Sequence, residues 1–350
     1  MAVNLMEIQP KRLAEELEYA SVISGKTSKA FKFDGGDRMK ILSLVPQSLN
    51  SYNRTASSNR YGTPAEQQDT VQYLYLDKDY GYSIPVDKGN FIEGNYLKTA
   101  AAVFKNQLNA VVAPDIEKDF FARICFNAGK INATSTAISA SNVMGRILAA
   151  EAAMRNARMP KDSRFVAVPT TILQFIRQAL TNCDGITDKL LMQGIVGRIG
   201  TLMVLEIADT DVPTGVNFVA WHKSSIVFEK TIDEVIAHKN PQGISGTLSE
   251  GRFRWGGGIV GQYAGGAYVD CLNTSQQAAP SIAVSGAITV GSSSDYTLYT
   301  TDGSDPRYSG TAVKITSGTT PSHTAGDVIK AVSYKAGKAG STVTSTTTTS

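Results

Sequence analysis

Apolar and polar residues alternate in two early segments, Arg38–Val45 and Thr70–Leu76, which predicts two β-strands. A third strand is predicted at Tyr82–Val86. The 24 residues Pro46–Asp69 between the first two are rich in Ser, Asn, Arg and Gln. A loop of this length inside a compact domain is usually functional or disordered. We therefore expect a long hairpin that projects from the body. The residues assigned to one alternating set are Met39, Ile41, Val71, Tyr73 and Tyr75.

An isolated two-stranded arm is not stable in water, so this hairpin needs another surface to lie on. A neighbouring copy of the chain is the simplest source of that surface. The polar N-terminal stretch, residues 1–32, also lacks an evident core of its own. Two such arms predict a protein whose final structure is an assembly.

Helical spacing of apolar residues follows in two places. The segment Tyr96–Phe126 is predicted to be a long helix that Pro114 breaks or kinks, with a new start at Asp115. Ser141 is the expected N-cap of a second helix that runs to Arg158. The buried stripe of this second helix is predicted to be Val143, Ile147, Ala150 and Met154.

Strands and helices then alternate without the steady order of a doubly wound sheet, which predicts an α+β fold. A short helix is expected near Asp233–His238, and Pro169 opens a helix that ends at Leu180. The other strands are predicted at Phe165–Val168, Leu202–Ile207, Phe218–Trp221, Ile226–Phe228 and around Arg252–Val260.

The chemistry of the chain changes at residue 273. The last 78 residues hold 30 Ser and Thr and lack Trp, Phe, Met and Cys. We expect a linker at 273–280, a small β-sandwich at 281–344 built from short alternating strands, and a disordered tail at 345–350.

Composition narrows the class of protein. Hydrophobic residues make up 42% and charged residues 19% of the chain, as in globular proteins. No apolar run is long enough to span a bilayer, and residues 1–20 do not look like a signal peptide, so we expect a cytoplasmic protein. The three cysteines, Cys125, Cys183 and Cys271, are far apart and are expected to be reduced core thiols. A net charge of +3 is too small to predict a basic face for nucleic acid.

Candidate catalytic chemistry is sparse. None of the three histidines, His222, His238 and His323, has a partner at metal-ligand spacing. The glycines of 256–262 match a dinucleotide-binding spacing without the helix that should follow, so close backbone approach in a strand is favoured. The Asp77/Asp79 and Asp209/Asp211 pairs are interpreted as turn caps. The sequence predicts no enzyme, no cofactor and no metal site.

The order of these segments resembles the major capsid proteins of tailed bacteriophages, which have the Hong Kong 97-type fold. Three passages carry the likeness: YLYLDKDYGYSIPVDKGNF at 73–91, VMGRILAAEAAMRNARMPKDSRFVAVPTTI at 143–172, and GRIGTLMVLEI at 197–207. The stretch Val219–Val260, which ends in FRWGGGIV, is similar to the closing segment of that family. The resemblance covers about residues 1–272.

This resemblance implies a capsid shell domain with named parts. They are an N-terminal arm (1–32), an extended loop (46–69), a spine helix (96–126) and an apical region (145–255). Arg54, Arg60 and Tyr61 are the expected inter-subunit residues of the loop. Some members cross-link a loop lysine, but this loop has none, so non-covalent locking is expected.

The resemblance also implies partners and a location. The partners are other copies of the chain in hexamers and pentamers, scaffolding and portal proteins, and packaged double-stranded DNA held without specific contacts. No membrane partner is expected. The protein is expected in the virion, after assembly in the cytoplasm of the bacterial host.

The last segment resembles the chitobiase C-terminal type of immunoglobulin-like module. The passages YTTDGSDP at 299–306 and GDVIKAVSYKAGKAG at 326–340 carry this likeness. It implies a structural turn formed by Asp302, Gly303, Asp305 and Pro306, and a module on the particle exterior that could contact surface glycans.

Two other readings stay open. An encapsulin-like nanocompartment shell has the same class of fold, and DNA in purified particles distinguishes the two. A secreted glycan-binding accessory protein is the second alternative. It calls for a signal peptide and a catalytic carboxylate pair, neither of which the sequence predicts.

Overall fold

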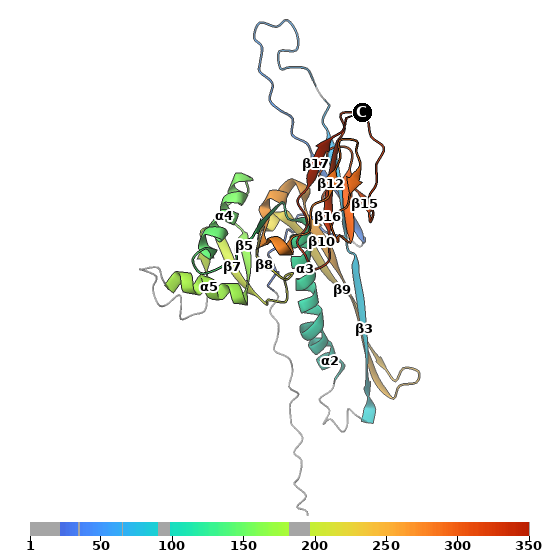
Figure 1. Ribbon diagram of the computed structural model, residues 1–350. Helices are drawn as coiled ribbons and strands as arrows, with labels where there is room; N and C mark the ends of the chain where they lie inside the picture. The colour runs from blue at the N-terminus through green and yellow to red at the C-terminus, as the bar shows by residue number, and fades with distance from the viewer. Residues whose placement is uncertain (1–21, 34–35, 65, 90–98, 182–196, 350) are drawn as a thin grey trace, which may run out of the picture.

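The computed structural model describes residues 22–33, 36–64, 66–89, 99–181 and 197–349. Figure 1 shows an elongated molecule in which a long sheet and a long helix run side by side. A mixed sheet with two helices lies to one side of them, and a small β unit sits beside the stem of a projecting hairpin. Helices and sheets are thus mixed in the α+β manner that the sequence predicts.

The projecting hairpin consists of β1 (Arg38–Leu44) and β2 (Asp69–Tyr75), which pair antiparallel. Its loop extends beyond the rest of the described chain (Figure 1). The predicted strand pair is confirmed, but the predicted apolar face is wrong in part. Ile41 pairs with Gln72 and is buried on the core side, whereas Val71, Tyr73 and Tyr75 belong to the opposite face. Side chains alternate with period two, so the register places Gln72 and Leu74 inward instead.

The long sheet has the strand order β3–β10–β9. These strands are β3 (Lys78–Asp87), β9 (Ile226–Lys239) and β10 (Gly246–Ile259). The helix expected near Asp233–His238 is wrong, because this segment is the second half of β9. Pairing with β10 continues as far as Lys239, so the tertiary ladder overrides the local helical pattern.

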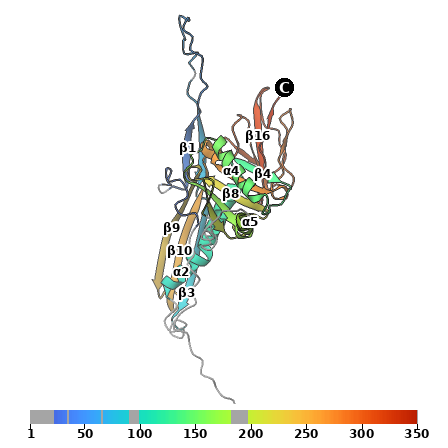
Figure 2. The ribbon, with the colours of Figure 1, turned by 90° about the vertical axis from the view of Figure 1, so that its left-hand side faces the viewer.

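The long helix is α2 (Ala100–Gln107), a π-helical turn at Leu108–Val112, and α3 (Ala113–Asn127). Pro114 does not break it. Its missing N–H falls next to the π turn, where the Ala113 N–H donates to the Leu108 carbonyl five residues back. The segment therefore continues through the proline as one run beside the long sheet (Figures 1 and 2).

The mixed sheet has the order β4–β11–β8–β5–β7–β6. Its strands are β4 (Lys130–Thr134), β5 (Arg164–Pro169), β6 (Arg198–Ile199), β7 (Leu202–Ile207), β8 (Val216–His222) and β11 (Ala267–Leu272). Helices α4 (Val143–Asn156) and α5 (Thr170–Thr181) pack against it. The expected apical region 145–255 is therefore shared between two sheets, since β9 and most of β10 belong to the long one.

The predicted stripe of α4 is confirmed, because Val143, Ile147, Ala150 and Met154 are all fully buried. The predicted cap is wrong. The helix begins after Asn142, and Ser141 lies one residue too early. The Asn142 side chain instead accepts from the Ser139 N–H at 2.9 Å, which holds the turn that leads into the helix.

The largest core lies between α3 and the two sheets. Phe120 and Phe121 of α3 contact the fully buried Trp221 of β8 in edge-to-face geometry. Chain residues before β1 join this core. Ile23 is buried in it, and the Trp221 indole donates to the Lys26 carbonyl at 3.0 Å. The expectation that residues 1–32 lack a home core is thus wrong for residues 22–32, while 1–21 lie outside the described residues.

The C-terminal unit has two small sheets, β12–β13 and β15–β14–β16–β17. Its strands are β12 (Ser281–Ile282), β13 (Ile288–Thr289), β14 (Tyr296–Thr300), β15 (Val313–Ile315), β16 (Val328–Tyr334) and β17 (Thr344–Thr347). Short 3₁₀ turns complete the fold at Lys223–Ser225, Gly261–Gly266 and Asn273–Ser275.

Two expectations for this unit need correction. The predicted disordered tail at 345–350 is ordered as far as Thr349, because β17 pairs with β16 and Thr348 is buried. The predicted linker at 273–280 is not a free connection either. Gln277 is buried, and its backbone N–H donates to the Ala339 carbonyl at 2.9 Å.

Candidate functional site

The hairpin loop carries exposed apolar side chains at the far end of the molecule. Leu49 is 100% and Tyr61 is 83% exposed. The ring of Tyr61 stands edge-to-face against that of Tyr52, with 4.9 Å between the centroids. The backbone N–H of Asn53 donates to the Arg60 carbonyl at 2.9 Å, which links the two sides of the loop. Large apolar groups held away from their own core are typical of contact surfaces.

The two arginines predicted at this loop lie in different surroundings. The Arg60 side chain donates from Nε to the Ala56 carbonyl at 2.8 Å and so stiffens the tip. Arg54 is exposed on the same loop. Both residues belong to the loop between β1 and β2, which extends beyond the rest of the described chain (Figure 1).

The outer face of the hairpin stem also exposes apolar side chains, next to the charged Arg38, Lys40 and Asp69. Leu42, Leu44 and Tyr75 are 59%, 66% and 48% exposed. On the inner face, Gln72 is buried and fixes the stem to the body. Its side chain donates to the Ile259 carbonyl at 2.7 Å and accepts from the Gly261 N–H at 2.8 Å. The stem is therefore anchored through its inner face, while Leu42, Leu44 and Tyr75 on its outer face remain exposed.

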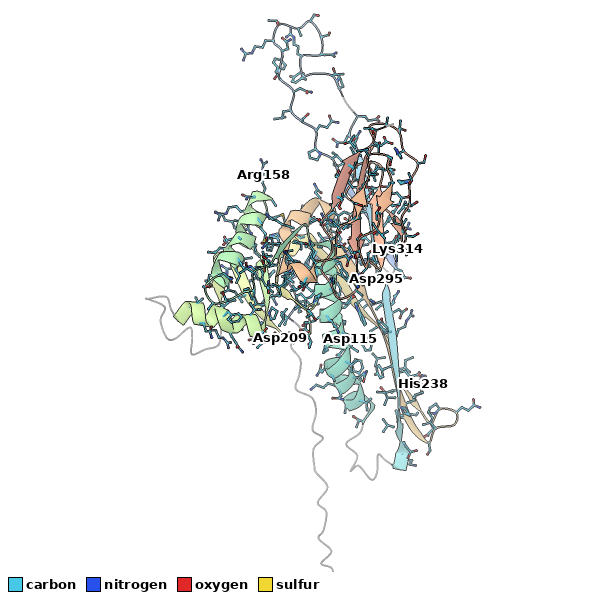
Figure 3. All side chains as sticks on the ribbon, viewed as in Figure 1. Asp115, Arg158, Asp209, His238, Asp295 and Lys314 are labelled. Carbon is cyan, nitrogen blue, oxygen red and sulfur yellow. The ribbon has the colours of Figure 1, made fainter. Side chains whose placement is uncertain are left out.

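A groove of about 450 Å³ runs between the long helix and the long sheet. Aromatic rings from the sheet form its floor, and Asp115 and Lys118 stand on its helical side. Figure 3 shows Asp115 on this helix and His238 at the far end of the long sheet. The rings are those of Tyr80, Tyr82, Phe253 and Trp255. The groove is an apolar surface with charged edges.

The three histidines lie in different parts of the structure and make different contacts. The buried His222 accepts from the Ser224 N–H at Nδ1, and burial lowers its pKa. His238 lies 3.2 Å from Glu250 across β9 and β10, in the strand that takes the place of the expected helix near 233–238. His323 Nδ1 contacts the Pro321 carbonyl at 2.9 Å. In the described residues, no three His, Cys, Asp or Glu side chains gather in a way that could hold a metal ion.

The two aspartate pairs make different contacts: the first forms ion pairs with arginines, and the second accepts hydrogen bonds from backbone N–H groups. Asp77 bonds to Arg123 of α3 at 2.5 Å, and hydrogen bonding with Arg252 lowers the pKa of Asp79. Both thus make ion pairs that the turn interpretation did not include. Asp209 accepts from the Thr171 N–H at 3.1 Å, at the start of α5, and Asp211 accepts from the Ala208 N–H within its own turn. Only Asp211 is therefore the local turn cap that was predicted, whereas Asp209 caps a helix 38 residues away.

The glycine run of β10 permits close packing, as predicted. A Cβ at Gly256 would lie 2.3 Å from the Tyr75 carbonyl oxygen, so the end of β2 crosses β10 there. Gly200 turns the chain between β6 and β7 with a positive φ of 59°.

Two cysteines are confirmed as buried free thiols. Burial raises the pKa of Cys125 far above its ordinary value and that of Cys271 to about 11. Both therefore stay protonated at neutral pH and are poor nucleophiles. Cys183 lies outside the described residues.

The predicted C-terminal turn residues form a compact hydrogen-bonded loop. Gly303 has a positive φ of 73°, and the Asp302 carboxylate accepts from the Ser304 N–H at 2.9 Å. Burial opposes ionisation there, but hydrogen bonds from Ser304 and Thr311 lower the pKa of Asp302. Asp305 pairs with Arg307 at 2.7 Å. Pro306 lies between the members of this pair and is buried.

The nearby sequence does not predict the buried hydrogen-bonded cluster around Asp270. Asp270 is fully buried in β11 and receives hydrogen bonds from Asn217 at 2.7 Å and Asn132 at 2.9 Å, and an ion pair from Arg146 at 2.8 Å. These partners lie 53 to 138 residues away. Their proximity to Asp270 depends on which distant elements pack together, so it could not be predicted from the sequence alone.

Comparisons with known proteins show the fold. No protein-family model and no curated protein matches the chain. A structure from Mycobacterium phage Che8 is similar with a TM-score of 0.65 and 20% identity, covering 77% of this chain and 98% of that one. The capsid structure of the cyanophage P-SCSP1u has a TM-score of 0.63 at 12% identity, covering 76% and 92%. The mature capsid of bacteriophage PhiM1 has a TM-score of 0.59 at 10% identity, covering 77% and 92%.

At these identities the likeness establishes a common fold with phage capsid chains. The match spans almost the whole of each of those chains, so it concerns a complete fold and not a shared fragment. Among the described helices, none is long and apolar enough to cross a membrane.

Proposed function

We propose that the chain is a shell-forming capsid subunit of a tailed bacteriophage. The observation that carries this proposal is the projecting hairpin (Figure 1), which exposes Leu44, Leu49 and Tyr61 away from the core of its own subunit. The likeness to chains of solved phage capsids supports it. The Hong Kong 97-type assignment, with loop 46–69, spine helix 96–126 and apical region 145–255, belongs to this proposal.

The mechanism is geometric. Each exposed Leu or Tyr of the hairpin gains about 1.5–3 kcal/mol when a neighbouring copy buries it. One such contact is weak, but a closed shell repeats it for every subunit, and each subunit is held by several neighbours at once. The expected partners are further copies in hexamers and pentamers, with scaffolding and portal proteins during assembly. A net charge of +3 suits a wall that encloses double-stranded DNA without specific contacts.

The C-terminal unit, within 281–344, is proposed to be an immunoglobulin-like module of the chitobiase type. The two small sheets support this assignment. A position on the particle exterior and contact with surface glycans are parts of the same proposal. The segment 299–306, with Asp302, Gly303, Asp305 and Pro306, then serves as a structural turn.

Electron microscopy of the purified full-length chain tests the main proposal. Closed or tubular particles are the expected result, either alone or on co-expression with the neighbouring phage genes. A double substitution, Leu49→Ser with Tyr61→Ser, removes the exposed apolar loop groups and should leave folded subunits that do not close into particles. Ser57→Ala in the same loop is the matched control and should assemble normally.

Chains that remain monomeric under all conditions, or a double variant that assembles as well as the control, would count against the proposal. Particles that carry DNA and tail proteins when purified from infected cells distinguish a virion from an encapsulin-like compartment.

A further inference from the structure

The C-terminal end of α3 lacks capping groups of its own. The last carbonyls of a helix have no partner within the helix and need one from elsewhere. No basic residue lies in the last turn of α3, and the chain leaves the helix at Ala128 in an extended conformation. A partner from another part of the chain is therefore required.

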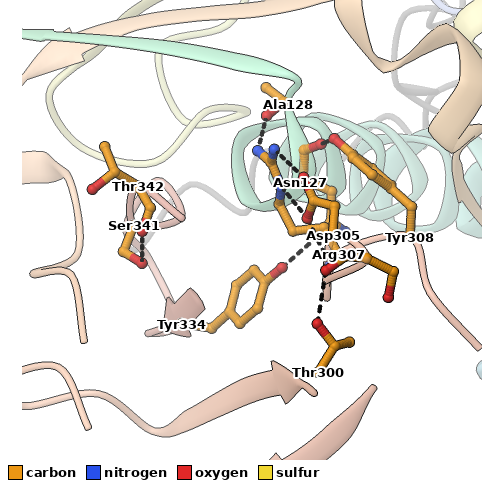
Figure 4. A network of polar contacts seen from close by, with 10 residues as sticks. Asn127, Ala128, Thr300, Asp305, Arg307, Tyr308, Tyr334, Ser341 and Thr342 are labelled. Carbon is orange, nitrogen blue, oxygen red and sulfur yellow. Dashed lines mark hydrogen bonds and ion pairs between the residues drawn. The ribbon is translucent and has the colours of Figure 1, made fainter. Parts of the chain in front are cut away.

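The C-terminal unit supplies these partners (Figure 4). The Gly340 N–H donates to the Cys125 carbonyl at 3.0 Å, and the Arg307 guanidinium donates to the Ala128 carbonyl at 2.6 Å. The Tyr308 hydroxyl donates to the Asn127 carbonyl. A cation at this end also faces the negative pole of the helix dipole, which stabilises the helix.

The side chains around these bonds are buried and complementary. The Tyr334 hydroxyl donates to the Asn127 side chain at 2.8 Å, and its ring meets that of Phe126 edge-to-face. Ala339 is fully buried and belongs to the main core, beside the residues of α3. The unit thus shares a core with the body and is not attached by the connecting segment alone.

The same unit also reaches the hairpin stem. The backbone N–H of Val45 donates to the Gln68 carbonyl, and the backbone N–H of Leu76 donates to the Asp37 carbonyl. These two hydrogen bonds show which residues of β2 direct their backbone N–H and C=O groups toward β1. By the alternation of an antiparallel ladder, the backbone of Val71 points away from β1. Its carbonyl accepts from the Gly310 N–H at 2.7 Å, so the C-terminal unit occupies the outer edge of β2.

We propose that residues 273–349 form an intramolecular brace, which caps α3, covers the free edge of β2 and so fixes the hairpin stem relative to the long helix. This role concerns contacts within one chain. It does not depend on the shell function or on a glycan ligand. It differs from the expected exterior attachment, because the unit would act on the rest of its own subunit.

Two glycines at the junction offer a direct test. A Cβ at Gly340 would lie 2.3 Å from the Phe126 carbonyl oxygen, and one at Gly261 would lie 2.6 Å from the Cβ of Tyr308. Neither contact can be relieved by rotating a flexible side chain. Gly340→Ala and Gly261→Ala should therefore separate the unit from the body. Gly197→Ala is the matched control, since a Cβ there meets nothing within 4 Å.

Hydrogen–deuterium exchange of the full-length variants, followed by mass spectrometry, is the measurement. Both junction variants should speed exchange about tenfold or more in peptides that contain Gly310, the stem of β2 and the end of α3. Peptides of α5 and of the β14–β16 ladder should exchange at the rate of the control. Tyr308→Phe keeps the ring but removes one capping hydroxyl, so it should give a smaller increase at the same places.

Unchanged exchange in β2 and at the end of α3, in variants that remain folded, would overturn the proposal. An equal increase in every peptide, α5 included, would overturn it as well, because the unit would then be one part of a single cooperative core.

Discussion

Buried polar side chains hold the distant parts of this chain together, and the histidine His222 is one of them. It is 4% exposed, and its Nδ1 accepts a hydrogen bond from the Ser224 N–H, which requires a ring nitrogen without a proton. Burial, reinforced by the nearby charge of Arg164, lowers its pKa in the folded protein. The folded state therefore binds this proton less readily than the unfolded state does.

This difference predicts a pH dependence of stability. The free energy of unfolding should fall as the pH drops from about 7.5 to about 5.5, because the unfolded chain takes up a proton near its ordinary pKa of about 6.5. The loss should level off below the lowered folded pKa. Urea unfolding at a series of pH values measures it, and His222→Gln should flatten the curve. His323→Gln is the control, and an equal flattening there would contradict this assignment.

At the scale of elements, the Gln72 side chain is one anchor of the hairpin stem. Gln72→Leu would take this partner from the buried Ile259 carbonyl and from the half-buried Gly261 N–H. An unsatisfied buried group costs about 1–3 kcal/mol, so we expect a loss of about 2–5 kcal/mol in the free energy of unfolding. Denaturant titration measures this. Thr70→Val, on the exposed part of the same strand, should change stability by less than about 0.5 kcal/mol, and a similar loss in both variants would contradict the anchoring role.

Local pattern was enough to predict most strands and helices, since alternation and helical spacing reflect which side faces the core. It failed where distant pairing decided the outcome. The segment 233–238 has a helical pattern but continues β9, because β10 lies beside it over its whole length. Pro114 was expected to break or kink the helix, but the helix continues through a π turn next to the missing donor. The inward face of β2 was misassigned because the register between β1 and β2 cannot be predicted from the sequence of either strand alone.

Of the candidate surfaces, the projecting loop could be predicted from the sequence and the C-terminal brace could not. The length and polarity of the loop predicted that it would project, since no core could accept it. The brace could not be predicted, because Arg307 and Tyr308 meet the end of α3 across 179 and 181 residues of chain. Nothing near either residue in the sequence indicates a partner at such a distance.

At the scale of the whole molecule, the proposed shell function predicts that neighbouring subunits are held without covalent bonds. The loop 46–69 contains no lysine, and the nearest ones are Lys40 and Lys78. Purified particles that are boiled with a reducing agent should therefore give one band of single-chain mass on a denaturing gel. A ladder of multiples would contradict this expectation, and a parallel sample without reducing agent separates any disulfide-linked species.

The capping of α3 has a consequence for the order of events at the ribosome. The helix is complete at residue 127, whereas the groups that close its end come from residues 307, 308 and 340. At about 5–20 residues per second, roughly ten to forty seconds of translation separate the two. During this interval the end of α3 and the outer edge of β2 in the nascent chain lack their hydrogen-bond partners from the C-terminal unit. A subunit whose synthesis stops early would keep both sites open, so completion of the chain itself would decide when the hairpin takes its final position.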